Sequence, residues 1–212
     1  MTGAGWMDLD RRRRTRLDPV GSPPGTLIRS DFDLNPQFRP QVPQHLRPAA
    51  VLAPIVRRPE GWTLILTRRT DTMPSHAGQV SFPGGRVQPG DAGALAAALR
   101  ETQVEIGLPP QALEPVGAVD PYETVTGYTI TPFVAYVDPS FSPVADPREV
   151  AEVFEAPLSF LFDPRNHERH EREWQGGTRA YYVMPYAHHF IWGATAGMIK
   201  ALYHPARRAG QG

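Results

Sequence analysis

The stretch FPGGRVQPGDAGALAAALRETQVEIGL, residues 82–108, joins a double glycine to a run of helix-forming residues. Two adjacent glycines let the backbone approach a ligand or a metal closely, because neither residue carries a Cβ atom. Asp91 has the side chain of an N-cap, and it predicts a helix over residues 92–106 that ends at Gly107. The stretch therefore predicts a glycine loop followed by one helix with charged residues near its end.

Glu101 and Glu105 are four residues apart, which places both side chains on one face of the predicted helix, with Cβ atoms about 6 Å apart. Two carboxylates held that close repel each other unless a cation lies between them. Ligands that are all oxygen favour Mg²⁺ or Mn²⁺ over zinc, and Mg²⁺ binds few carboxylates together with substrate phosphates. The pair indicates metal-assisted attack of water on a phosphate ester or anhydride. Spacing alone leaves open that the pair is simply solvated, because such pairs are common on exposed helices.

The segments around this helix alternate in type without the regularity of a doubly wound parallel sheet. Apolar runs at 49–56 and 62–67, with turn residues between them, predict a hairpin. We expect further strands over 79–82, 113–119, 128–137 and 180–183, and helices over 157–162 and 191–203. The sequence thus predicts an α/β (α+β) fold with a mixed β-sheet between helices.

Composition excludes several classes of protein. The 212 residues contain no cysteine, which excludes disulfides, thiolate catalysis and thiolate metal sites. The 22 basic and 22 acidic residues cancel, so no global field attracts nucleic acid. No apolar run approaches the roughly 18–20 residues that span a bilayer. We expect a cytoplasmic protein that has a small-molecule partner and binds neither membranes nor nucleic acid.

The chain divides by composition into three parts. Residues 1–45 are basic, rich in proline and without apolar periodicity, and predict an N-terminal arm with little secondary structure. Residues 46–205 predict the catalytic domain, and residues 206–212 a C-terminal tail. The run Arg11–Arg14 fits contact with RNA or an acidic surface, or a solvated arm without a partner.

Residues 85–108 resemble the Nudix box, whose usual form is G-x5-E-x7-R-E-U-x-E-E-x-G-U, with U a bulky aliphatic residue. Gly85 opens the match and residues 100–108 close it. Asp91 stands where the box has its first glutamate, and the spacer before Arg100 is one residue longer. The resemblance implies a Nudix-type α/β/α sandwich and a pyrophosphohydrolase acting on phosphorus-containing anhydrides.

Segments outside the box resemble one subfamily in particular. Residues 64–70 and 76–85 resemble the upstream signature of coenzyme A pyrophosphatases, and residues 122–128, 149–154 and 191–197 are also similar to that subfamily. This implies divalent-metal-dependent hydrolysis of the diphosphate bond of coenzyme A or a related nucleoside diphosphate conjugate. The alternatives are a Nudix hydrolase for ADP-ribose or dinucleotides, and a non-catalytic nucleotide-binding Nudix module.

The same resemblance assigns roles to residues of the box. Glu105 would bind the metal, and Glu101 would bind metal or help to deprotonate the attacking water. Arg100 would orient a carboxylate, and the carbonyl oxygen of Gly85 could add a ligand. For the carboxylate that often comes from outside the box, Glu149 is our choice. Glu152 and Glu123 are its rivals.

Five residues upstream of the box helix are candidate substrate contacts. Arg68 and Arg69 carry charges suited to phosphates, although a solvated strand end explains them equally well. His76 and Gly78 belong to the upstream signature, where His76 fits a substrate role, a loop-ordering role or a plain loop. Gly84 is the other half of the double glycine.

Two positions depart from the family pattern. Val104 stands where the box has the first of two adjacent glutamates, and a valine cannot ligate a cation. Unless Val104 simply packs against the sheet, this predicts an impaired or inactive hydrolase. Pro74 occupies the place of an arginine in the coenzyme A signature, which removes one candidate phosphate clamp.

The remaining candidates have simpler explanations. The charged segment 166–173, with His167 and His170, predicts an exposed stretch. His188 and His189 precede an apolar segment and predict a structural or capping role. Trp192 reads as a core residue, with a stacking site for adenine as the alternative.

Overall fold

The computed structural model describes residues 17–18, 29–41 and 45–203. Nine of the strands in this part of the chain form a mixed sheet along the path β1-β7-β8-β2-β3-β4, with β5, β6 and β9 paired to β2, β8 and β3. These strands are β1 (Arg29–Ser30), β2 (Arg47–Arg58), β3 (Gly61–Arg69), β4 (Val80–Ser81), β5 (Gly84–Arg86), β6 (Leu113–Ala118), β7 (Tyr122–Glu123), β8 (Tyr128–Val137) and β9 (Val150–Pro157). The sheet is mixed because β2 pairs antiparallel with β3 and parallel with β8.

Helices cover both faces of this sheet. The helices are α2 (Ala94–Ile106), α3 (Leu158–Leu161) and α4 (Ala194–Tyr203), with short 3-10 turns η1 (Asp31–Asp33), η2 (Pro36–Phe38), η3 (Pro110–Ala112) and η4 (Pro164–Asn166). Successive residues of a strand point to opposite faces. Leu52 of β2 shares a core cluster with Ala97 of α2, whereas its neighbours Val51 and Ala53 share one with Ile199 of α4. Both neighbours of Leu52 thus face the layer of α4, and the predicted α/β/α sandwich is confirmed.

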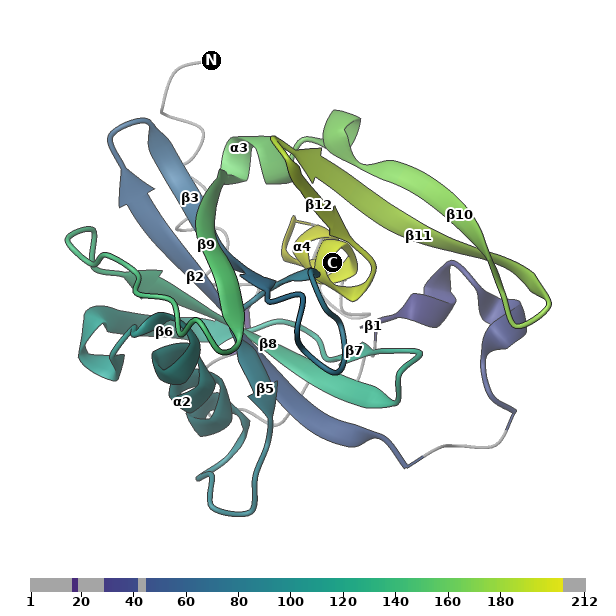
Figure 1. Ribbon diagram of the computed structural model, residues 1–212, viewed down its shortest axis with the longest axis horizontal. Helices are drawn as coiled ribbons and strands as arrows, with labels where there is room; N and C mark the ends of the chain where they lie inside the picture. The colour runs from purple at the N-terminus through teal and green to yellow at the C-terminus, as the bar shows by residue number, and fades with distance from the viewer. Residues whose placement is uncertain (1–16, 19–28, 42–44, 204–212) are drawn as a thin grey trace, which may run out of the picture.

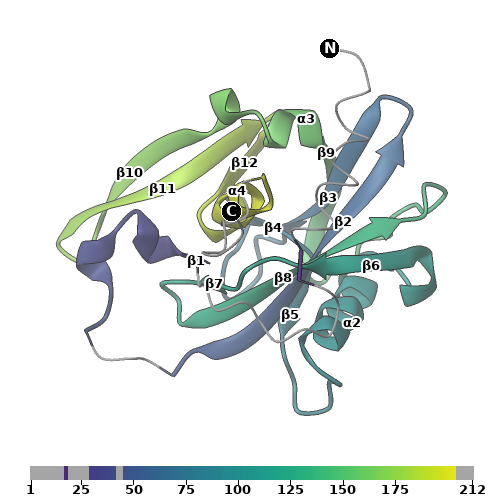
Figure 2. The same ribbon diagram turned by 180° about the vertical axis from the view of Figure 1, so that it is seen from behind.

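A second, smaller sheet lies beyond α4. It is antiparallel and contains β10 (Glu168–Trp174), β11 (Gly177–Tyr186) and β12 (His189–Trp192). Figures 1 and 2 show α4 between this sheet and the large one, with α2 on the far side of the large sheet. In the described part of the chain, no helix is long and apolar enough to cross a membrane.

The predicted hairpin of β2 and β3 is confirmed, but two other expectations need correction. The terminal helix begins at Ala194 and not at residue 191, because Ile191 pairs with Met184 in the small sheet and Gly193 turns the chain with φ 63°. The segment 166–173 is largely exposed as expected, yet residues from 168 onward are strand β10, which pairs with β11.

Part of the predicted N-terminal arm is packed onto the domain. Phe32 is buried, and the Asn35 side chain donates to the Ala180 carbonyl oxygen (2.9 Å) and accepts from the Ala180 N–H (2.7 Å). Residues 29–38 therefore act as a strap against β11. The arginine run 11–14 and the tail 206–212 lie outside the described residues, so their roles stay predictions.

Candidate active site

Glu105 lies at the buried end of α2, where it meets the glycine loop. Its side chain is 4% exposed, its Oε2 accepts from the Gly84 N–H (3.2 Å), and Arg69 Nη1 lies 3.9 Å from its Oε1. Gly84 has φ 147°, and a Cβ there would collide with the Ala50 carbonyl oxygen. The glycine thus lets β5 lie close enough to β2 for its N–H to meet the glutamate.

Glu101 lies one helical turn earlier, against the second glycine. A Cβ on Gly85 would lie 3.0 Å from Glu101 Cδ and 3.1 Å from its Oε1, which is tighter than ordinary contact. The double glycine therefore leaves room for both box carboxylates beside the loop backbone. This arrangement matches the close approach expected from the sequence.

Arg100 links the helix to the preceding loop through two carboxylates. Its Nη1 donates to Glu101 Oε1 (2.6 Å), and its Nε and Nη2 donate to the two oxygens of Asp91 (2.8 and 3.0 Å). The Arg100 guanidinium lowers the pKa of Asp91 to about 2. The prediction that Asp91 caps the helix is wrong, because Gly93 occupies the N-cap position and the Asp91 side chain is committed to Arg100.

Three carboxylates, Glu101, Glu105 and Glu149, line one side of a single cavity, and we call them the acidic wall. Burial is the main cause that raises the pKa of Glu105 to about 8; the charges of Glu101 and Glu149 act in the same direction, and the Gly84 N–H and Arg69 oppose them. The ionised form of Glu105 is thus poorly compensated by protein groups. An all-oxygen donor set with surplus negative charge fits a hard divalent cation.

The rivals of Glu149 lie elsewhere. Glu123 accepts from Arg39 (3.3 Å), and Glu152 lies 3.7 Å from Arg68 Nε, and neither lines this cavity. Of the three candidates for a carboxylate outside the box, the structure brings only Glu149 to Glu101 and Glu105.

The cavity has a volume of about 700 Å³, and basic and aromatic side chains also line it. We call Arg47, Arg86, Tyr128, Arg172 and Trp192 the basic–aromatic wall. The guanidinium carbons of Arg47 and Arg86 lie 4.0 and 5.6 Å from the centre of the Tyr128 ring, and that of Arg172 lies 5.1 Å from the Trp192 ring. Within the described residues, no carboxylate lies within ion-pair distance of these three arginines, so their charge is free to meet an anion.

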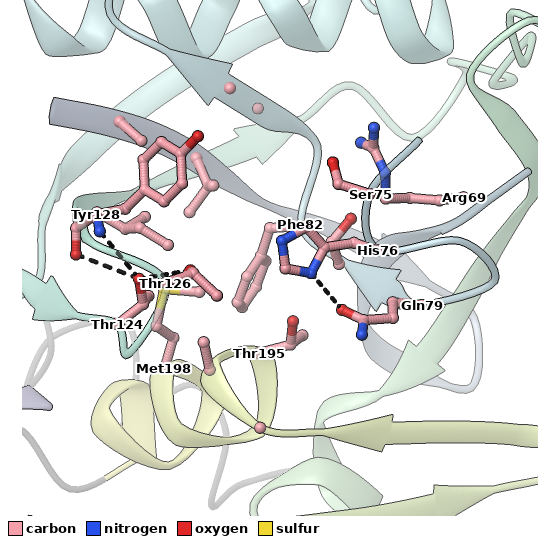
Figure 3. Close-up of a pocket in the computed structure, with 18 of the residues that line it drawn as sticks. Arg69, Ser75, His76, Gln79, Phe82, Thr124, Thr126, Tyr128, Thr195 and Met198 are labelled. Carbon is pink, nitrogen blue, oxygen red and sulfur yellow. Dashed lines mark hydrogen bonds between the residues drawn. The ribbon is translucent and has the colours of Figure 1, made fainter. Parts of the chain in front are cut away.

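Figure 3 shows how the large sheet and α4 meet around the cavity. Thr195 and Met198 extend from α4, and Tyr128 lies on the opposite side from Arg69. Phe82 lies between them and is 2% exposed. The floor of the cavity is therefore apolar between two polar ends.

The candidate substrate contacts divide into two groups. Arg69, His76 and Gly84 line the cavity, and the exposed His76 ring pairs with Gln79 at 2.9 Å. Arg68 does not line it and lies 3.5 Å from Asp71, because adjacent residues of β3 point to opposite faces. Gly78 does not line it either; its φ of 67° is the left-handed turn conformation that favours glycine.

Val104 is 46% exposed and does not line the cavity. It therefore does not pack against the sheet, which removes the simplest alternative explanation for a valine at this position. The Nudix-box departure lies on an open surface of α2, beside the buried Glu105.

The basic–aromatic wall could not be recognised from the sequence. Its residues come from β2, β5, β8, β10 and β12, so no local spacing connects them. Trp192 was expected in the core, with adenine stacking as the alternative; it is half-buried and lines the cavity. A buried ion pair between Arg179 and Asp31 (3.1 Å) also lines it, and Asp31 belongs to the segment that was assigned to the arm.

Comparisons with known proteins agree with this geometry. The sequence model of the NUDIX domain matches residues 46–176. The chain is 42% identical over 169 residues to NudL of Escherichia coli K12, described as an uncharacterized Nudix hydrolase, covering 80% of this chain and 87% of the relative. NudL of Cronobacter sakazakii is also 42% identical, over 168 residues. A solved structure, DR0079 from Deinococcus radiodurans, is 16% identical with a TM-score of 0.50 over 77% of this chain and 89% of that one, which supports the fold alone.

The glycine loop and glutamate-bearing helix on a mixed sheet define a Nudix-type hydrolase. The chain belongs to the Nudix family, whose model covers most of its residues. It is a pyrophosphohydrolase of this family, a group that uses divalent metals and acts on small nucleotide conjugates.

Proposed function

We propose that this chain hydrolyses the diphosphate bond of coenzyme A or a related nucleoside diphosphate conjugate. The observation that carries the proposal is the cavity itself, which is lined by both the acidic wall and the basic–aromatic wall. A substrate that joins a diphosphate to a phosphorylated nucleoside needs both: a metal site at the diphosphate, and cations and aromatic faces at the nucleotide. The resemblance of residues 64–70 and 76–85 to the coenzyme A signature supports the same choice.

Glu105, Glu101 and Glu149, with the carbonyl oxygen of Gly85, would hold Mg²⁺ or Mn²⁺. When bound, such an ion offsets the charge of the diphosphate and makes water a better nucleophile. Arg100 fixes the Glu101 carboxylate through its 2.6 Å hydrogen bond. Glu101, the more exposed of the two box carboxylates, can then accept the proton of the attacking water.

Arg69 and His76 lie at the same end of the cavity as the acidic wall, in positions to contact the diphosphate. Elsewhere in the cavity, the ring faces of Tyr128 and Trp192 can stack on a base. Arg47 and Arg172 can pair with a further phosphate, such as the 3′-phosphate of coenzyme A. Water attack on one phosphorus breaks the bridging P–O bond and leaves two monoester products.

Product analysis of the full chain tests this proposal. The chain is incubated with Mg²⁺ or Mn²⁺ and, separately, coenzyme A, an acyl-coenzyme A, ADP-ribose and a diadenosine polyphosphate, and the products are identified by mass spectrometry. We expect adenosine 3′,5′-bisphosphate and 4′-phosphopantetheine from coenzyme A. Preferential cleavage of ADP-ribose or the dinucleotide would overturn the substrate assignment. Binding measured by calorimetry without metal-dependent turnover would support a non-catalytic module.

A further inference from the structure

A second group of metal-ligating side chains lies where the β11–β12 hairpin meets β9. It comprises Glu152 of β9, His188 of the hairpin turn and His189 at the start of β12, and we call it the hairpin cluster. Each residue offers one ligand atom, and these atoms all lie within 4.8 Å of one another. None of the three residues lines the catalytic cavity, so the cluster is separate from the acidic wall.

The hairpin cluster contains one long hydrogen bond, between His188 Nε2 and Oε2 of Glu152 at 3.5 Å. His188 Nε2 and His189 Nε2 each lie 3.5 Å from the same oxygen, Oε1 of Glu152. This is at the far end of the hydrogen-bond range. Zinc with bonds of about 2.0–2.2 Å in a tetrahedral arrangement separates its ligand atoms by roughly 3.3–3.6 Å. Each histidine nitrogen thus already lies at ligand spacing from the carboxylate oxygen, and the two nitrogens lie within 4.8 Å of each other.

The buried histidine has no better partner within the described residues. His189 is 6% exposed, its ring stacks on Phe154 at 3.5 Å, and its Nδ1 has no hydrogen-bond partner. Buried polar groups are normally satisfied. His189 departs from this rule at Nδ1. Its Nε2 is therefore a buried ligand atom that faces a carboxylate without a hydrogen bond between them.

Arg68 contributes the remaining charge at this place. The Nε atom of Arg68 lies 3.7 Å from Oε2 of Glu152. His189 approaches the other oxygen of this carboxylate, Oε1. A guanidinium behind a metal ligand can orient that ligand. Its positive charge also weakens cation binding relative to an unpaired glutamate, so we expect an affinity below that of a four-ligand structural zinc site.

We propose that the hairpin cluster binds a zinc-class divalent ion, which ties the β11–β12 hairpin to β9 of the large sheet. Two imidazoles and one carboxylate suit zinc, whereas the all-oxygen acidic wall suits Mg²⁺ or Mn²⁺. The 73% exposed side chain of His188 leaves the fourth position open to water. Because β12 also carries Trp192, the ion would fix the strand that supplies part of the basic–aromatic wall.

Zinc titration of the metal-stripped full chain by calorimetry, in saturating Mg²⁺, tests this proposal. We expect one zinc equivalent in the unsubstituted chain and a rise in melting temperature with zinc. His188→Ala and Glu152→Gln should weaken zinc binding at least about tenfold, since even residues behind metal ligands often have effects of this size. His170→Ala is the matched control, because this partly exposed histidine pairs with a single glutamate, Glu168, at 2.6 Å.

A second zinc titration distinguishes binding at the hairpin cluster from binding at the catalytic site. Zinc binding should persist in Glu105→Gln, which removes a ligand of the acidic wall. Loss of zinc binding in Glu105→Gln with unchanged binding in His188→Ala would overturn the proposal, because the ion would then occupy the acidic wall. An absence of zinc binding in the unsubstituted chain would overturn it as well.

Discussion

The acidic wall and the basic–aromatic wall line the same cavity, yet they are built by different means. Glu101 and Glu105 come from a single turn of α2, and Gly84 and Gly85 give them room. The basic–aromatic wall collects side chains from five strands and two sheets. The chemistry of this protein is therefore encoded locally, whereas the surface proposed to select its substrate exists only after the chain has folded.

The two walls also differ in how their charges are compensated. Glu105 is buried beside two further carboxylates, so its charge requires a cation. Arg47 and Arg172 of the basic–aromatic wall lie over aromatic rings, in contacts that contribute about 0.5–1 kcal/mol each at exposed sites. We therefore expect substitutions in the acidic wall to change turnover strongly, and those in the basic–aromatic wall to change substrate affinity more moderately.

Glu105→Gln should have the largest effect. The amide keeps the size of the side chain but loses the charge that binds the metal, so metal-dependent turnover should fall by more than about 100-fold, beyond the range of residues behind the ligands. Steady-state kinetics with Mg²⁺ and Mn²⁺ measure it. Glu60→Gln in the exposed β2–β3 turn is the control. If turnover of Glu105→Gln stayed within a few-fold of that of the unsubstituted chain, the acidic wall would not be the metal site.

Glu105→Gln also tests whether the buried charge of Glu105 is poorly compensated, because such a charge makes the stability of the fold depend on pH. The folded-state pKa of Glu105, about 8, lies above its unfolded value, so its stabilising contribution is complete below about pH 4.5 and is lost as the pH rises through about 8. The melting temperature of the metal-free chain should fall between pH 6 and pH 9. In Glu105→Gln the fall should be smaller by several degrees. Parallel melting curves for the two chains would contradict the proposed burial cost.

Val104→Glu should restore the missing glutamate of the Nudix box. Val104 is 46% exposed, so a glutamate there disturbs no core contact. A further carboxylate near Glu105 should strengthen metal binding and raise turnover by about tenfold or more, the size of effect typical around metal sites. Val104→Gln controls for side-chain length without the charge. Equal, robust turnover of all three chains would show that Val104 is no defect.

The difference between the walls also explains what could be predicted from the sequence. Glu101 and Glu105 needed only helical periodicity, and the double glycine needed only its lack of Cβ atoms. The position of Asp91 was identified but its role was misassigned, because N-cap preference says nothing of an arginine nine residues later. The small sheet was partly missed, since β10 is exposed and charged and lacks the apolar alternation that identifies a half-buried strand.

Long-range packing set the remaining limits. Residues 29–38 look like a polar, proline-containing arm, yet Asn35 satisfies the backbone of Ala180, 145 residues away. No periodicity marks such a contact. The hairpin cluster was also outside the reach of the sequence, because the adjacent histidines gave no ligand spacing until β9 placed Glu152 beside them.

Trp192→Ala should have a moderate effect that falls on affinity. Loss of an aromatic face that stacks on a base costs roughly 1–3 kcal/mol of binding free energy. We therefore expect KM for coenzyme A to rise about tenfold while kcat changes little. Phe190→Ala is the control, because Phe190 lies on the same strand, is 46% exposed and does not line the cavity. A fall in kcat without a change in KM would contradict the proposal that the basic–aromatic wall acts on substrate affinity and the acidic wall on turnover.

Asp91→Asn should have the smallest effect, because Asp91 reaches the acidic wall only through Arg100 and Glu101. The amide loses the charge that anchors the guanidinium, so Glu101 should be held less firmly and kcat should fall a few-fold, as partly exposed ion pairs contribute little. With a pKa of about 2, Asp91 stays ionised at any working pH, and its anchoring is lost only as the pH falls toward that value. The deficit of the variant should therefore be the same at pH 6 and pH 9.

Asp163→Asn removes a similar aspartate–arginine pair that does not line the cavity, and should leave kcat unchanged. A deficit that appears only at high pH would contradict this chain of contacts and place the effect on Glu105 instead.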